Sequence, residues 1–116
     1  MANLSWPQRA ALALGVALLV WGVVDLVLGR IPLGLFHVIT GGAVAAAAFR
    51  VRAERFTGTF LALVFLVVFA VGSGTPGGPL DAGTVGNSLH LLLGFASVAI
   101  AEGCVWCEQR ARQRLP

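Results

Sequence analysis

The chain has 116 residues, of which 58% are hydrophobic and only 11% are charged, and its formal net charge is +3. Soluble domains carry about 25% charged residues, so this composition excludes an ordinary soluble domain and favours a protein embedded in lipid. Because a membrane-crossing helix needs about 20 apolar residues, residues 1–116 have room for about four crossings in a single transmembrane domain, and none for a separate catalytic domain.

The first predicted span covers residues 8–28. Ser5 and Gln8 have the spacing of a capping box, and Pro7 lies where the first helical turn would be. A signal peptide is the alternative, but its apolar stretch is usually about 7 to 15 residues long and ends at a small-residue cleavage site. This stretch is longer and contains Asp25, so we expect a retained span.

Three further apolar runs predict spans over residues 31–49, 56–71 and 85–106. The arginine-rich segment 50–55 and the glycine- and proline-rich segment 72–79 separate them, and both have the composition of turns. Since unpaired backbone groups are excluded from hydrocarbon, neither segment can lie inside the bilayer. The predicted fold is all-α, a bundle of four transmembrane helices.

The basic residues are all arginine, and with four spans only Arg30 falls on one side of the membrane, while the others fall on the opposite side with both chain ends. The positive-inside rule then predicts cytoplasmic N and C termini and a multi-pass protein of the plasma membrane. Trp6 and Trp106 would mark the inner interface. This orientation, and not nucleic-acid binding, accounts for the arginines. The use of arginine without lysine, together with the many alanines and glycines, favours a bacterial source.

An internal repeat relates the two halves of the chain. Leu35-Phe36-His37 is echoed by Ser88-Leu89-His90, and a glycine follows each histidine by four residues, at Gly41 and Gly94. Two such halves predict two helical hairpins that run parallel and are related by an axis along the membrane normal. Each histidine is then expected near the outer end of its helix.

Four ionisable residues fall inside the predicted spans: Asp25, His37, His90 and Glu102. Ionisable groups are costly in a membrane, so each is a candidate site residue. Asp25 and both histidines are predicted at one depth near the outer surface. In an up-down-up-down bundle the second and fourth helices lie on a diagonal, so the two histidines should face each other across the core.

Two interpretations of these residues concern polar contacts and metal binding. In the first, His37 and His90 make interhelical polar contacts with Asp25, Asn87, Ser88 or a backbone carbonyl. In the second, the two histidines bind a metal ion with Asp25 or Asp81, since imidazole and carboxylate together suit zinc or another first-row ion.

A third interpretation is a b-type haem held between the imidazoles of His37 and His90, with Gly41 and Gly94 leaving room for the macrocycle. Paired histidines are also common by chance. We therefore expect no cofactor, and keep metal and haem as alternatives.

Glu102 lies four residues before Trp106, near the predicted inner interface and the arginines of the middle loop and tail. We expect an interfacial ion pair, which contributes little stability because such pairs are partly hydrated. A proton-relay role is the alternative.

Cys104 and Cys107 are three residues apart and share one helical face. A reducing compartment would keep them as thiols, and the pair lacks the preceding strand of a thioredoxin-like site and the second ligand pair of a zinc site. Structural or lipid-facing thiols are expected, with acylation or an intersubunit metal as alternatives.

Small residues recur every four positions on the second and fourth predicted spans, which allows helix backbones to approach closely. They pack either inside the bundle or against another subunit. The helix-packing candidates are Gly41, Gly42, Ala45, Ala46, Gly94, Ala99 and Gly103.

Over nearly its whole length the chain resembles a family of small bacterial four-helix membrane proteins, the domain of unknown function family 4383. The resemblance is carried by residues 35–41, Leu-Phe-His-Val-Ile-Thr-Gly, and residues 87–94, Asn-Ser-Leu-His-Leu-Leu-Leu-Gly. The family pattern has asparagine three residues before each histidine; Asn87 matches, and Gly34 departs from it. The resemblance implies a four-span plasma-membrane protein without an established activity, cofactor or catalytic residue.

The sequence contains no nucleophile beside a base, no phosphate-binding glycine loop and no paired catalytic carboxylates, so we expect no catalytic residues. The expected function is that of a small non-enzymatic membrane protein, an accessory or oligomerising subunit of a membrane complex or a homo-oligomer. The alternative is an outer-side metal- or haem-binding protein that uses His37 and His90. A channel or transporter is disfavoured, because four spans leave little room for a substrate cavity.

Overall fold

The computed structural model describes residues 4–114 of the chain, and every regular element in this range is a helix. The elements, in chain order, are α1 (Trp6–Val27), α2 (Ile31–Ala47), α3 (Val51–Gly74) and α4 (Gly83–Gln113). The all-α prediction with four helices is confirmed.

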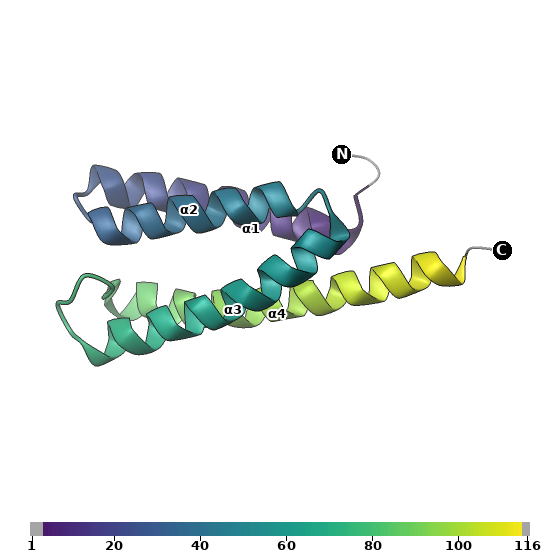
Figure 1. Ribbon diagram of the computed structural model, residues 1–116. Helices are drawn as coiled ribbons and strands as arrows, with labels where there is room; N and C mark the ends of the chain where they lie inside the picture. The colour runs from purple at the N-terminus through teal and green to yellow at the C-terminus, as the bar shows by residue number, and fades with distance from the viewer. Residues whose placement is uncertain (1–3, 115–116) are drawn as a thin grey trace.

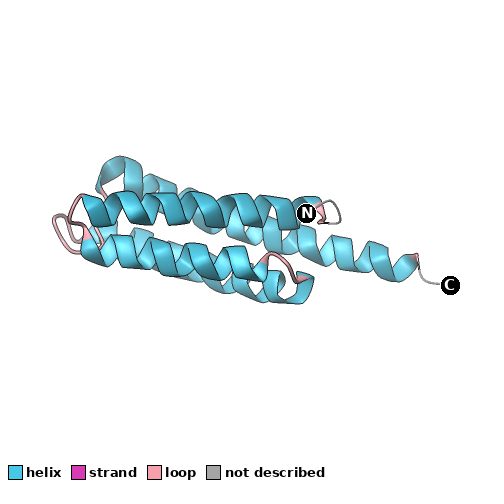
Figure 2. Ribbon diagram, turned by 90° about the horizontal axis from the view of Figure 1, so that it is seen from above, coloured by secondary structure: helices cyan, strands magenta, loops and turns pink. Residues whose placement is uncertain are grey.

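The four helices form two hairpins that lie side by side (Figure 1). The first hairpin is α1 with α2, and the second is α3 with α4; helices within a hairpin pack far more closely than helices of different hairpins. Both hairpin turns lie at one end of the molecule, which we call the turn end, and the chain termini and the α2–α3 connection lie at the other, the terminal end (Figures 1 and 2). Since α1 contacts α4 and α2 contacts α3, α2 and α4 lie on a diagonal.

Glycines allow the close packing within each hairpin. A Cβ atom on Gly15 of α1 would lie 2.7 Å from the backbone nitrogen of Ala45 in α2, and one on Gly22 would lie 2.7 Å from the backbone nitrogen of Val38. In the second hairpin, a Cβ on Gly58 would lie 2.9 Å from the carbonyl oxygen of Ser97. Larger residues at these positions would push the helix backbones apart.

The start of α1 follows the predicted capping pattern. The backbone N–H of Ser5 donates to Oε1 of Gln8 at 3.0 Å, and Pro7 occupies the first turn. The helix begins at Trp6, two residues before the predicted span, and turns into α2 through Gly29, whose φ of +82° favours glycine.

The expected charged turn over residues 50–55 is wrong, because α3 already begins at Val51. Only residues 48–50 connect α2 to α3, and the backbone of Arg50 is extended (φ −131°, ψ 117°). Arginine, alanine and glutamate are good helix formers, and Glu54 in the first turn interacts favourably with the helix dipole. For the same reason, the charged segment after Trp106 continues α4 as far as Gln113.

Three of the four helices are long and apolar enough to cross a membrane: α1, α3 and α4. The remaining helix, α2, is apolar but has only 17 residues. At ~1.5 Å per residue it is ~25 Å long, slightly less than the ~30 Å of a typical hydrocarbon layer. The number of crossings therefore depends on α2.

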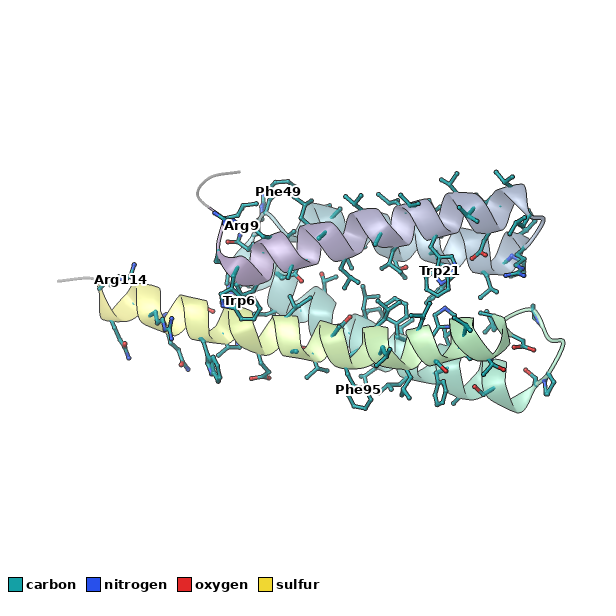
Figure 3. All side chains as sticks on the ribbon, turned by 180° about the vertical axis from the view of Figure 1, so that it is seen from behind. Trp6, Arg9, Trp21, Phe49, Phe95 and Arg114 are labelled. Atoms are coloured by element: carbon teal, nitrogen blue, oxygen red, sulfur yellow. The ribbon has the colours of Figure 1, made fainter. Side chains whose placement is uncertain are left out.

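Many large apolar side chains are exposed, and the interior contains both apolar and polar side chains. Large apolar side chains cover the outside; Phe95, for example, points away from the bundle (Figure 3) and is 62% exposed. The interior contains an apolar cluster around Leu18, Leu61 and Phe65. It also buries eight polar or charged side chains: Gln8, Asp25, His37, Thr40, Glu54, Asn87, His90 and Ser97.

Candidate functional site

Three helices bring ionisable side chains together in the interior near the turn end. Asp25 lies in the last turns of α1, on the same buried face as Leu18 and Gly22. His37 lies in the second turn of α2, and His90 in the second turn of α4. Because the hairpins are parallel, the end of α1 and the starts of α2 and α4 lie at one depth.

The three side chains form one hydrogen-bonded chain, which we call the Asp–His–His chain. Nδ1 of His37 lies 2.9 Å from Oδ2 of Asp25, and Nε2 of His37 lies 2.8 Å from Nε2 of His90. Both histidines are completely buried, and Asp25 is 2% exposed. The contact between His37 and His90 joins the diagonal helices, and hence the two hairpins.

The Asp25 carboxylate determines where the protons lie in this chain. A carboxylate only accepts hydrogen bonds, so Nδ1 of His37 carries a proton and donates it to Asp25. A neutral His37 then has an unprotonated Nε2, which accepts a hydrogen bond from the Nε2–H of His90. This leaves Nδ1 of His90 as a buried acceptor, and it has no hydrogen-bond partner among the described residues.

Aromatic rings enclose both imidazoles. The indole of Trp21, which points from α1 into the interior (Figure 3), stacks on His37 with a centroid distance of 3.9 Å and on His90 with one of 5.1 Å. Phe65 of α3 stacks on the ring of His90, and the edge of Phe36 faces the same ring. This apolar surrounding fixes the ring planes and strengthens the hydrogen bonds between them.

Arg30 connects the Asp–His–His chain to the molecular surface at the turn end. Its Nη1 lies 3.8 Å from Oδ1 of Asp25, and its side chain is 57% exposed. The carboxylate thus has a histidine donor on one oxygen and a guanidinium near the other, which together balance its buried charge.

The arrangement does not fit the metal site expected from His37, His90 and Asp25. Asp25 and His90 are bonded to opposite nitrogens of the His37 ring and do not converge on one point. A zinc ion bound to both Nε2 atoms at ~2.0 Å each would hold them ~3.3 Å apart in tetrahedral geometry, farther than the observed 2.8 Å. Among the side chains that the structure describes, which do not include those of Cys104 and Cys107, no group of three or more metal-ligating residues is arranged to hold an ion.

A b-type haem does not fit either. Its macrocycle would have to lie between the two Nε2 atoms, which are in direct contact, and Trp21 covers the faces of both imidazoles. Gly41, one of the glycines expected to leave room for the macrocycle, instead lies against Leu18 and Leu19 of α1.

Asn87 and Asp81 belong to a different feature, the loop that leads into α4. Nδ2 of Asn87 donates to Oδ1 of Asp81 at 2.9 Å, and its Oδ1 accepts from the backbone N–H of Ala82. Asp81 also accepts from the N–H groups of Gly77 and Gly83, and these bonds, first that from Gly77, lower the pKa of its carboxyl group. Of the alternative partners expected for the histidines, Asp25 is therefore found and Asn87 is not, because the Ala82 amide and Asp81 use the hydrogen-bonding groups of Asn87.

The ion pairs at the terminal end involve Glu108, and Glu102 is exposed. Glu108 binds Arg55 of α3 and Arg112 of its own helix. Glu102 lines a surface hollow together with Arg52 and Arg55. Glu102 lies near arginines, as predicted, but the carboxylate that forms these ion pairs is that of Glu108.

Glu54 is a buried acid that the sequence interpretation missed. It is 2% exposed, and its Oε2 has no hydrogen-bond partner among the described residues. The missed signal was its spacing, because Glu54, Gly58, Leu61 and Phe65 all occupy the buried face of α3. Placing residues 50–55 in a turn removed Glu54 from that pattern.

The small residues divide between the interior and the surface. Gly41 and Ala45 pack against Gly15 of α1, Gly94 lies near the carbonyl oxygen of Ala62, and Gly103 lies against Trp6. Gly42 faces open space, and Ala46 and Ala99 are exposed. Cys104 and Cys107 belong to α4, but their side chains lie outside what the structure describes.

Comparisons of this chain with protein-family models, with curated proteins and with solved structures gave no match.

Proposed function

We propose that the protein is a small non-enzymatic integral membrane protein that crosses the bacterial plasma membrane four times. The observation that supports this best is the distribution of its side chains: large apolar side chains are exposed along the helices, and Asp25, His37, Glu54 and His90 are buried in the interior. In lipid this arrangement is the stable one, because apolar groups face the hydrocarbon and costly polar groups pair with one another. The shorter α2 would cross with slight local thinning of the bilayer.

In the proposed orientation the terminal end faces the cytoplasm. Arg9, the α2–α3 connection and the arginines of the α4 tail lie at the terminal end, and Arg30 lies at the turn end. Trp6 and Trp106 are 61% and 64% exposed at the level of the terminal end, as expected for an aromatic belt.

Reporter fusions test the crossings and the orientation. A cytoplasmic reporter fused after Arg114 should be active, and a periplasmic reporter inserted at Gly29 or Gly77 should also be active. The inverse pattern would contradict the orientation. Reporters that place Gly29 and the α2–α3 connection on the same side of the membrane would contradict four crossings, because α2 would then not cross.

We further propose that the protein is an oligomerising or accessory subunit that docks through α2. Its surface presents Gly42, Ala46 and the 67% exposed Ile39, next to an apolar groove between α2 and α3 that Phe60 and Val64 also line. A transmembrane helix of a second copy or of a larger complex fits such a face, since small residues permit close approach in lipid.

The particle size in mild detergent tests this role. The wild-type protein should elute as an oligomer or with a stoichiometric partner, and Gly42→Leu should reduce that assembly because it fills the open position. Ala70→Leu, on the exposed surface of α3, is the matched control and should leave the assembly unchanged. A monomeric wild-type particle without a partner would contradict the proposal.

Membership of family 4383 is part of the same proposal. The two motifs that carry the resemblance meet in the interior, where His37 and His90 are in contact. This supports a common role for the two motifs in joining the hairpins.

A further inference from the structure

Three buried polar atoms lack a hydrogen-bond partner among the described residues: Nδ1 of His90, Oγ of Ser97 and Oε2 of Glu54. Their residues are 0%, 3% and 2% exposed. Buried polar atoms of folded proteins are nearly always bonded to protein or to water, so three such atoms in one small bundle require an explanation.

The three residues follow one another along the bundle from the turn end to the terminal end. His90 and Ser97 share the buried face of α4 and are seven residues apart, which is ~10 Å along the helix. Ser97 lies at the level of Gly58 in α3, because a Cβ on Gly58 would be 2.9 Å from the Ser97 carbonyl oxygen. Glu54 lies one turn, or ~6 Å, from Gly58 toward the terminal end.

From His90, the Asp–His–His chain leads to the molecular surface at the turn end. Arg30 at the surface contacts Asp25, Asp25 is bonded to His37, and His37 is bonded to His90. The Asp–His–His chain thus crosses the bundle at one depth near the turn end, and Ser97 and Glu54 follow at successive depths toward the terminal end.

We propose that Asp25, His37, His90, Ser97 and Glu54 form a path that conducts protons across the membrane, with water molecules bridging the unpartnered atoms. The inference rests on the proposed membrane crossing. It requires no substrate cavity, which removes the objection that four helices offer too little room for transport. It also gives a role to Glu54, the buried acid outside the Asp–His–His chain.

Each group on the path can pass a proton without any other bond being broken. An imidazole takes up a proton at one ring nitrogen and releases one from the other, and a hydroxyl accepts on its lone pair while it donates its hydrogen. When His37 becomes doubly protonated, the negative charge of Asp25 stabilises it. His37 reaches this state when a proton from the Ser97 side binds Nδ1 of His90 and His90 passes its Nε2–H to Nε2 of His37. His37 then passes its Nδ1–H to Asp25 toward the turn end, and both rings return to their starting tautomers before the next proton.

The apolar cluster makes the path selective. Leu61 and Phe65 fill the interior beside the polar groups, and both are at most 4% exposed. A hydrated sodium or potassium ion could not pass such a core, whereas a proton moves along hydrogen bonds without a hydration shell.

Proton flux into proteoliposomes tests the proposal. Vesicles containing the purified protein and an internal pH dye would receive a potassium gradient and valinomycin, which compensates the charge moved by protons. The wild-type protein should change the internal pH faster than protein-free vesicles. Glu54→Gln should lose this excess flux, because the amide cannot take up and release a proton, and Ser97→Ala should reduce it.

Glu102→Gln is the matched control, since Glu102 is an exposed acid on α4 near the terminal end. It should keep the wild-type flux. Circular dichroism and the elution volume would establish that each variant is folded; if Glu54→Gln is not, Ser97→Ala serves in its place, because it removes only one hydroxyl oxygen.

Labelling of engineered cysteines from each side of the same vesicles separates the two proposals. With four crossings verified, a wild-type flux equal to that of protein-free vesicles would overturn the proton path alone. An unchanged flux in both Glu54→Gln and Ser97→Ala would overturn it as well. A labelling pattern without four crossings would refute the proposed topology, and with it the path.

Discussion

The two neutral histidines differ in which ring nitrogen carries the proton, because only His37 contacts a carboxylate. Asp25 accepts from Nδ1 of His37, which makes Nε2 of His37 an acceptor for His90. Asp25, which is not bonded to His90, therefore determines which nitrogen of His90 is protonated. Such a chain transmits a change of proton position from one ring to the next.

Nitrogen-15 NMR of histidine-labelled protein tests this assignment. In neutral wild-type protein we expect His37 to carry its proton on Nδ1 and His90 on Nε2, because Asp25 can only accept. Asp25→Ala should remove the preference of His37 for Nδ1. A protonated Nε2 with an unprotonated Nδ1 at His37 in the wild type would contradict the proposed proton positions.

At the scale of single elements, glycines decide which helix faces can meet. Gly15 and Gly42 are both helical glycines, but Gly15 is in contact with the backbone of α2 and Gly42 faces open space. The same substitution at the two positions should therefore have opposite effects.

Gly15→Ala should lower the free energy of unfolding by about 1–3 kcal/mol, because the new Cβ would lie 2.7 Å from the Ala45 nitrogen and the helices would have to separate. Gly42→Ala should leave stability unchanged or raise it by up to about 1 kcal/mol, through helix propensity. Denaturant titration in detergent micelles measures both. Equal effects of the two substitutions would contradict the packing described for the first hairpin.

The loop before α4 is held by the Asp81 carboxylate, which gives it a pH dependence. Because the folded loop lowers the pKa of Asp81 below its ordinary value of 3.8, its stabilising effect is fully present above that value and is lost as the pH falls through the lowered pKa. Amide hydrogen exchange at Gly77 and Gly83 should therefore accelerate, after correction for intrinsic rates, only when the pH falls below about 3.8.

In the Asp81→Asn variant the same two amides should be less protected at neutral pH, and their protection should no longer change with acid. Persistent, acid-sensitive protection in that variant would assign the pH dependence to another group.

For the whole molecule, the weak point is the interface between the hairpins. Each hairpin is tightly packed internally, whereas few contacts join the two. The bond between His37 and His90, together with the rings of Trp21 and Phe65, is a large part of that interface near the turn end. The Asp–His–His chain therefore also holds the hairpins in register.

His90→Leu should lower the free energy of unfolding in detergent by about 1–2 kcal/mol, because it removes the bond to His37 and the stacking of His90 with its aromatic neighbours. Ser88→Ala is the control, since Ser88 is exposed and its hydroxyl bonds only to a carbonyl of its own helix. It should change stability little. An equal effect of both substitutions would show that the histidine contact does not hold the hairpins together.

The sequence by itself determined the number and type of the elements, because long apolar runs and the breaks between them are local properties of the chain. It also placed Asp25, His37 and His90 at one depth, since helix rise and a parallel pair of hairpins fix the levels. One local error came from treating charge as a sign of a turn, because residues 51–55 begin α3. The fourth predicted span ended at Trp106, whereas α4 continues to Gln113.

Only the tertiary structure decided which side chains meet. Asn87 is bonded to Asp81 in the loop before α4. Asp25 and His90 are bonded to opposite nitrogens of His37. Glu54 is buried, whereas Glu102 is exposed. These outcomes depend on how each helix is rotated about its axis. That rotation is set by the close approach of glycines and small side chains on neighbouring helices, and no single helix contains that information.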